Sequence, residues 1–126
     1  MNRVVHFEIH ADDPERAIAF YSEAFAWTFH AFGEGMEYWT IVTGPEDQPG
    51  INGGLVRRQG GRPDEGQAVT AFVCTVSVAS VDEAAARVVA AGGRIVVPKF
   101  EVPGVGWCCY AKDTEGNILG LFEDAA

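Results

Sequence analysis

Near its start, the chain alternates between apolar and ionisable side chains. Residues 5–11 read Val-His-Phe-Glu-Ile-His-Ala. Because successive side chains of a strand point to opposite faces, this pattern predicts a strand with one apolar face and one face that carries His6, Glu8 and His10. All three of these groups can exchange protons or bind metals, which makes this face the first candidate for a functional site.

A helix is expected directly after this strand. Asp13 can accept hydrogen bonds from free backbone N–H groups, and Pro14 suits the first helical position. Apolar residues then recur at helical spacing as far as Phe25. Three strands are predicted next, at residues 27–32, 38–42 and 51–57.

The same order of elements returns in the second half of the chain. A strand is predicted at residues 71–78, and Ser80 with Glu83 forms a capping box that opens a helix ended by Gly92 and Gly93. The remaining strands are predicted at residues 94–99, closed by Pro98, and at residues 105–111 and 117–123. An offset of 67 residues places Asp13 on Ser80 and superposes the apolar faces of the two opening strands.

This repeat predicts an α+β fold made of two tandem βαβββ modules. Module one spans about residues 1–62, a connector about 59–67, and module two about 66–126, within a single domain over residues 1–126. We expect an open, curled mixed sheet around a concave cup, with the helices on the outer face. His6, Glu8 and His10 would lie in the cup, beside Val73, Thr75 and Ser77.

Charge and composition exclude several classes of function. The net charge of −9 argues against nucleic acid as a partner, since phosphate binding relies on clustered Lys and Arg. No apolar run approaches the roughly 18 to 20 residues that a membrane span needs, and charged residues interrupt the only place for a signal peptide. We therefore expect no membrane partner and a cytoplasmic location.

Several motifs resemble one known group of proteins. His6-Phe7-Glu8-Ile9, followed by residues 12–17 and by Phe25-Ala26-Trp27, resembles the first module of the vicinal oxygen chelate superfamily, which includes glyoxalase I, bleomycin-resistance proteins and extradiol dioxygenases. Residues 50–55, 103–107 and 112–117 are similar to an uncharacterised bacterial branch related to lactoylglutathione lyase. The resemblance covers nearly the whole chain and implies the fold more strongly than a reaction.

The resemblance to glyoxalase I implies four metal-ligand positions, one on each of four related strands. His6 matches the first position, whereas the other three fall on Gly54, Val73 and Gly120. His6 and Glu8 could still share one ion, because side chains two apart on a strand lie about 6.6 Å from each other. We expect no cofactor, with a divalent metal held by His6 and Glu8 as the open alternative.

Two functions remain open from the sequence. The first is an enzyme that acts on a small carbonyl-containing or aromatic metabolite, with His6 and Glu8 as its catalytic acid–base pair. The alternative is a metal-free, bleomycin-resistance-like protein that sequesters a cationic ligand, which the acidic charge suits. The resemblance also implies a homodimer that binds a small molecule. The residues expected to line the ligand pocket are His10, Tyr38, Gly54, Val73, Thr75, Trp107 and Gly120.

Overall fold

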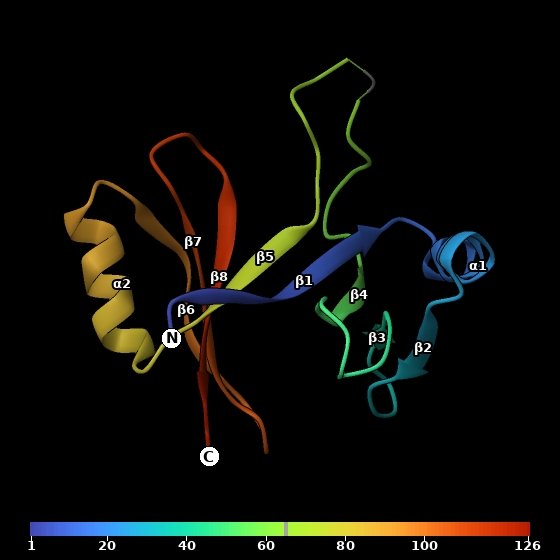
Figure 1. Ribbon diagram of the computed structural model, residues 1–126. Coiled ribbons are helices and arrows are strands. Elements are labelled where there is room, and N and C mark those ends of the chain that lie inside the picture. The colour runs from blue at the N-terminus through green and yellow to red at the C-terminus, as the bar shows by residue number, and fades with distance from the viewer. Residues whose placement is uncertain (65) are drawn as a thin grey trace. The chain divides into compact units, whose positions relative to one another are not determined.

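The computed structural model describes residues 1–64 and 66–126, which form two units (Figure 1). The first unit comprises His6–Phe72, and the second comprises Met1–Val5 together with Val73–Ala126. Each unit contains one helix and a set of paired strands. Neither helix in the described part of the chain is long and apolar enough to cross a membrane.

The first unit has the predicted order strand, helix, strand, strand, strand. Within its sheet the strands lie in the order β2-β3-β4-β1, in which β1 is parallel to β4 and the other neighbours are antiparallel. Its elements are β1 (Arg3–Ala11), α1 (Pro14–Phe25), β2 (Thr28–Ala31), β3 (Tyr38–Val42) and β4 (Gly53–Arg57).

The apolar face of β1 forms the core of the first unit. The buried residues of this core are Phe7, Ile9, Ala11, Ile41 and Leu55, and α1 packs on them through Ala17, Ile18 and Tyr21. The helix begins as predicted, because the Asp13 carboxylate accepts a hydrogen bond of 3.1 Å from the backbone N–H of Arg16. Burial of the odd-numbered residues against α1 leaves His6, Glu8 and His10 on the opposite face of the strand.

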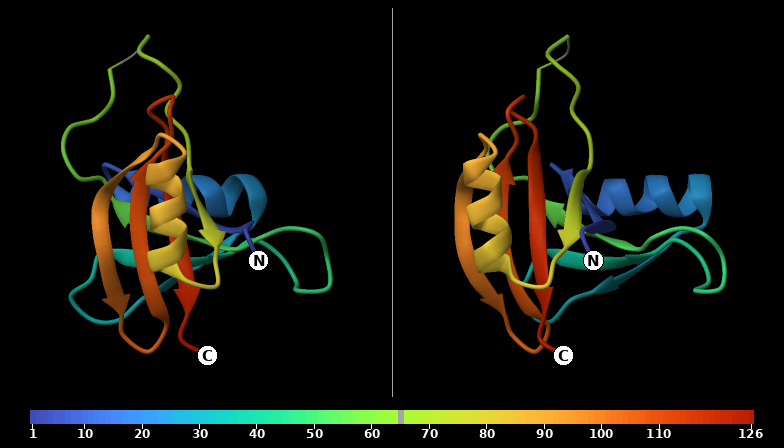
Figure 2. Two further views of the ribbon diagram at one scale, coloured as in Figure 1. Left: turned by 90° about the vertical axis from the view of Figure 1, so that its left-hand side faces the viewer. Right: turned by 60° about the vertical axis from the view of Figure 1, so that its left-hand side comes forward.

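The second unit repeats this arrangement. Its strands lie in the order β5-β8-β7-β6, with β5 parallel to β8 and with β7 antiparallel to both of its neighbours. Figure 2 shows α2 along one face of these strands. The predicted α+β fold of two βαβββ modules is therefore confirmed. The elements are β5 (Val73–Ser77), α2 (Val81–Ala90), β6 (Arg94–Val102), β7 (Gly106–Lys112) and β8 (Ile118–Asp124).

Two side chains cap the start of α2. The Ser80 hydroxyl accepts a hydrogen bond of 3.1 Å from the backbone N–H of Glu83, as the capping box predicts. The backbone N–H of Val81 donates to the Glu123 carboxylate at 2.9 Å. Glu123 thus ties the last strand to the first turn of the helix, where a negative charge also stabilises the helix dipole.

One predicted strand end is wrong. Pro98 does not close a strand at residue 99, since β6 continues to Val102. β6 lies at the edge of its sheet and pairs with β7 alone, and its register shifts between Ile95 and Val97 and again between Val97 and Phe100. A proline lacks a backbone donor, and edge strands with irregular pairing tolerate that loss.

Asp113 organises the loop that joins β7 to β8. Its carboxylate accepts hydrogen bonds from the backbone N–H groups of Asn117 and Glu115 at 2.9 and 2.8 Å, and from the Asn117 side chain at 3.1 Å. These bonds, led by the one from the Asn117 backbone, hold the pKa of Asp113 below its ordinary value. A lowered pKa in the folded state means that the ionised form stabilises the fold.

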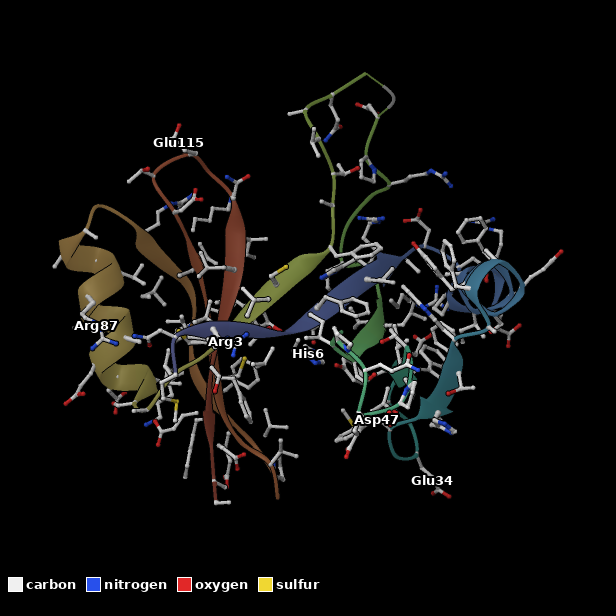
Figure 3. All side chains as sticks on the ribbon, viewed as in Figure 1. Arg3, His6, Glu34, Asp47, Arg87 and Glu115 are labelled. Atoms are coloured by element: carbon white, nitrogen blue, oxygen red, sulfur yellow. The ribbon has the colours of Figure 1, made fainter. Side chains whose placement is uncertain are left out.

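This stabilisation should disappear in acid. It is present above the unfolded pKa of about 3.9 and is lost as the pH falls through the lower folded value. We expect Asp113→Asn to lower the melting temperature at pH 7 and the difference from wild type to shrink towards pH 3. Asp47→Asn, at the exposed loop position labelled in Figure 3, is the control and should leave the melting temperature unchanged. A difference at Asp113 that stays constant from pH 7 to pH 3 would contradict this assignment.

Candidate functional site

Three side chains of the first unit meet on the ionisable face of β1. The Tyr38 hydroxyl lies 3.2 Å from the Nε2 atom of His6 and 3.2 Å from the Oε2 atom of Glu8. The same two atoms of His6 and Glu8 are 3.7 Å apart. We call these residues the His6–Tyr38–Glu8 cluster; His6 is labelled in Figure 3.

A glycine allows Tyr38 to reach β1. β4 lies between β3 and β1, and Glu8 pairs with Gly54 while Tyr38 pairs with Val56. A side chain from β3 must therefore cross β4 to contact Glu8. A Cβ atom at Gly54 would overlap the Tyr38 hydroxyl. The phenol of Tyr38 thus occupies the space at Gly54, a residue that was expected to line the ligand pocket.

The hydrogen bonds of the cluster favour one arrangement of its protons. An ionised carboxylate only accepts hydrogen bonds, so the single hydroxyl proton of Tyr38 goes to Glu8. With Glu8 ionised and Tyr38 donating to it, the contact between Tyr38 and His6 is consistent with the tautomer of His6 whose Nε2–H donates to the phenol oxygen. In neutral His6 this tautomer leaves the lone pair on Nδ1.

The two ionisable groups differ in their access to solvent. The side chain of Glu8 is 14% exposed, whereas that of His6 is 33% exposed. The carboxylate is therefore the inner member of the cluster and the imidazole the outer one. This order suits a histidine that meets a ligand while the carboxylate, through Tyr38, orients its ring.

His10 does not join the cluster in the described structure. Its backbone carbonyl accepts a hydrogen bond of 3.0 Å from the Arg58 guanidinium, and the residue lines a cavity beside α1. Strand alternation predicted that His6, Glu8 and His10 share a face. Alternation alone did not show that Tyr38 of β3 contacts His6 and Glu8 and not His10.

The other predicted site residues belong to the second unit. Val73 and Thr75 are buried, and Thr75 pairs with Gly120. A Cβ atom at Gly120 would lie 2.8 Å from the Thr75 hydroxyl and 3.2 Å from the ring of Tyr110. Side chains therefore fill the space at this glycine too.

Trp107 lies on the other face of the second unit. It packs against the core that includes Cys109 and Leu121, and the Lys99 ammonium lies 5.5 Å from the centre of its ring. Tyr110, three residues further along β7, contacts the Gly120 side instead. Trp107 thus packs with the helix-covered core and not beside Gly120, where a ligand wall was expected.

Comparison with known proteins identifies the family. A model of the Glyoxalase/Bleomycin resistance protein/Dioxygenase superfamily matches residues 3–121. The chain belongs to this superfamily. The predicted resemblance is therefore confirmed, and a search of curated proteins found no matching sequence.

Solved structures share the fold at low identity. A methylmalonyl-CoA epimerase variant from Streptomyces coelicolor, in complex with 2-nitronate-propionyl-CoA, is 18% identical, with 99% of each chain covered and a TM-score of 0.65. The methylmalonyl-CoA epimerase of Mycobacterium tuberculosis is 14% identical, with 98% of this chain and 88% of that one covered and a TM-score of 0.64. A hypothetical protein of Bacillus halodurans is 9% identical, with 98% and 95% covered and a TM-score of 0.66.

The donor set does not fit the metal site implied by glyoxalase I. A catalytic divalent ion takes about three protein ligands. His6 and Glu8 supply two, with the Tyr38 hydroxyl in contact with both, and Gly54 supplies none. Across residues 1–64 and 66–126, no three His, Cys, Asp or Glu side chains come together as a metal would require. We therefore derive no chemistry from a metal.

The cluster depends on the absence of a side chain at position 54. We expect Gly54→Ala to push the Tyr38 ring off His6 and Glu8, since its Cβ would occupy the place of the hydroxyl, and to destabilise the fold by about 1–3 kcal/mol. Long-range ¹H–¹⁵N NMR of the imidazoles should show that His6 loses its fixed Nε2–H tautomer. Tyr38→Phe should produce the same imidazole change without the steric cost.

Gly44→Ala provides the matched control. A Cβ atom at Gly44 meets nothing within 4 Å. Both the stability and the His6 signals of this variant should equal those of wild type. Unchanged His6 signals in Gly54→Ala and in Tyr38→Phe would mean that the three side chains do not form a cluster in solution.

Proposed function

We propose that the protein is an enzyme that moves a proton on a carbon atom next to the carbonyl group of a small metabolite. The observation that carries the proposal is the contact of the Tyr38 hydroxyl with both His6 and Glu8. Superfamily membership supports an enzyme that acts on a small molecule. Two structural neighbours that share the fold at low identity are methylmalonyl-CoA epimerases, and epimerisation beside a carbonyl requires this kind of proton transfer.

His6 is the proposed general base. Its Nδ1 lone pair takes the proton from the carbon, the C–H electron pair forms the C=C bond of an enolate, and the carbonyl π electrons move to oxygen. Return of the proton to the same carbon restores the carbonyl. The substrate supplies every atom and electron of this sequence, so no co-reactant is needed. Histidine suits the role because it exchanges protons readily near neutral pH.

Tyr38 and Glu8 position the base. When Nδ1 accepts a proton, His6 becomes a cation whose Nε2–H already donates to Tyr38, and Tyr38 in turn donates to Glu8. The negative charge of Glu8 therefore stabilises the imidazolium through one intervening hydroxyl. Charge-assisted hydrogen bonds of this kind are stronger than neutral ones.

The test is exchange of substrate protons with deuterated water. The purified protein is incubated in D₂O with a panel of small ketones, hydroxyketones and acyl thioesters that includes methylmalonyl-CoA, and loss of the carbon-bound proton is followed by NMR. We expect at least one compound to exchange, and His6→Gln to slow that exchange by about 100-fold or more. Glu8→Gln and Tyr38→Phe should lower kcat more than they change KM.

Two controls separate this chemistry from its alternatives. His30→Gln alters an exposed histidine on β2, outside the cluster, and should keep full activity. A chelator should leave exchange unchanged, because the proposal uses no metal. Failure of every compound to exchange, together with saturable binding of a cationic glycopeptide, would replace this proposal with the sequestering function.

We also propose that the protein is a homodimer in the cytoplasm. Several large apolar side chains of the first unit are exposed, which favours contact with another surface: Phe20, Phe25, Met36 and Val42. Light scattering at micromolar concentration should give twice the 13.5 kDa mass of the chain. A mass of one chain at that concentration would contradict the dimer.

A further inference from the structure

A cavity of about 340 Å³ lies where β1 ends and α1 begins. It is distinct from the His6–Tyr38–Glu8 cluster, none of whose three residues line it. A cavity of this volume is large enough for a small ligand. A neighbouring cavity of about 470 Å³ shares Asp12, Arg58 and Arg62 with it, so the two open around the same charged side chains.

Arg58 is held in place at the wall of this cavity. Its Nε atom donates to the Asp12 carboxylate at 3.0 Å, and its Nη2 atom donates to the backbone carbonyl of His10 at 3.0 Å. The side chain is only 27% exposed. These two bonds use one edge of the planar guanidinium, and the Nη1–Nη2 edge keeps N–H donors for a ligand.

The charges around the cavity favour an anion with a single negative charge. Its lining carries three arginines, Arg16, Arg58 and Arg62, against the two carboxylates of Asp12 and Asp13. The lining of this cavity therefore keeps one positive charge, although the whole chain carries −9. Arg62 and Arg16 pair with Asp12 and Asp13 at 3.7 and 4.0 Å, and the neighbouring cavity adds the carboxylate of Asp64. A multiply charged phosphate would meet the nearby carboxylates with too little positive charge to balance it, whereas a carboxylate matches both the charge and the fork of Arg58.

The remaining wall of the cavity is apolar. Ile9 and Ala11 of β1 face Ala17, Phe20 and Tyr21 of α1. Phe20 and Tyr21 form an edge-to-face ring pair with centres 4.9 Å apart. An aromatic or branched apolar body would bury its surface against these side chains while its charged end lies at Arg58.

We propose that this cavity binds a small monocarboxylate with an apolar or aromatic body. The carboxylate lies on the Nη1–Nη2 edge of Arg58, Arg62 and Arg16 lie around it, and the body packs on Phe20 and Tyr21. The site does not depend on the proton-transfer reaction proposed for the His6–Tyr38–Glu8 cluster, and either one can fail without the other.

Benzoate is the probe, and its binding to the full chain is followed by ¹H–¹⁵N and ¹H–¹³C NMR. We expect saturable shifts at Phe20, Tyr21 and the Arg58 guanidinium, with a Kd of about a millimolar, which is ordinary for so small a ligand. Arg58→Gln should weaken binding tenfold or more. The Arg62 side chain is 74% exposed, so we expect Arg62→Gln to fold even if Arg58→Gln does not. Arg62→Gln should weaken binding severalfold.

Matched controls decide the outcome. Arg87 is an exposed arginine of α2 that does not line the cavity, so Arg87→Gln should bind benzoate like wild type. Benzamide has the same shape without the charge and should bind at least tenfold more weakly. The proposal is overturned if benzoate shifts nothing at Phe20 and Tyr21, if benzamide binds equally well, or if phenyl phosphate binds more tightly than benzoate.

Discussion

The alternation of β1 is the constraint on which the first unit depends. One residue in two is apolar and packs under α1, and this burial fixes which face of the strand carries the ionisable groups. A shift of one residue in pairing would bury His6 and Glu8 and expose Phe7 and Ile9. The strand register of β1 therefore determines both the core and the candidate site. The free energy of hydrophobic burial that fixes this register also holds the site in place.

The candidate site depends on a contact between β3 and β1, two strands that are not neighbours in the sheet. Two groups that can exchange protons lie on one strand, and a phenol from beyond the intervening strand links them. The order Glu8, Tyr38, His6 leaves an imidazole nitrogen with a lone pair at the outer end and a partly buried carboxylate at the inner end. In catalytic triads a carboxylate bonds the histidine base directly and holds it in one tautomer, whereas here the hydroxyl of Tyr38 stands between the two groups.

The fold could be predicted almost completely from the sequence, because its signals are local. The caps at Asp13 and Ser80 and the alternating strands each act over a few residues, and the repeat confirms one module by the other. The predicted end of β6 was wrong because a proline indicates a strand end unless the strand lies at the edge of a sheet, and the sequence did not show that β6 lies there. The meeting of His6 with Glu8 followed from alternation on one strand. The contact of Tyr38 with these two residues could not be predicted in this way. It depends on the Tyr38 side chain crossing β4, and only the pairing of β3, β4 and β1 determines whether it does.

Gly54 and Tyr38 constrain each other sterically. At position 54, where the glyoxalase I resemblance implies a carboxylate ligand, the hydroxyl of Tyr38 now occupies the place of the first side-chain atom. A mutation that introduced an acidic residue there would displace the phenol before it could gain a metal. A carboxylate at position 54 and the phenol of Tyr38 therefore exclude each other, so a single substitution at Gly54 would not supply a metal ligand while Tyr38 stays in place.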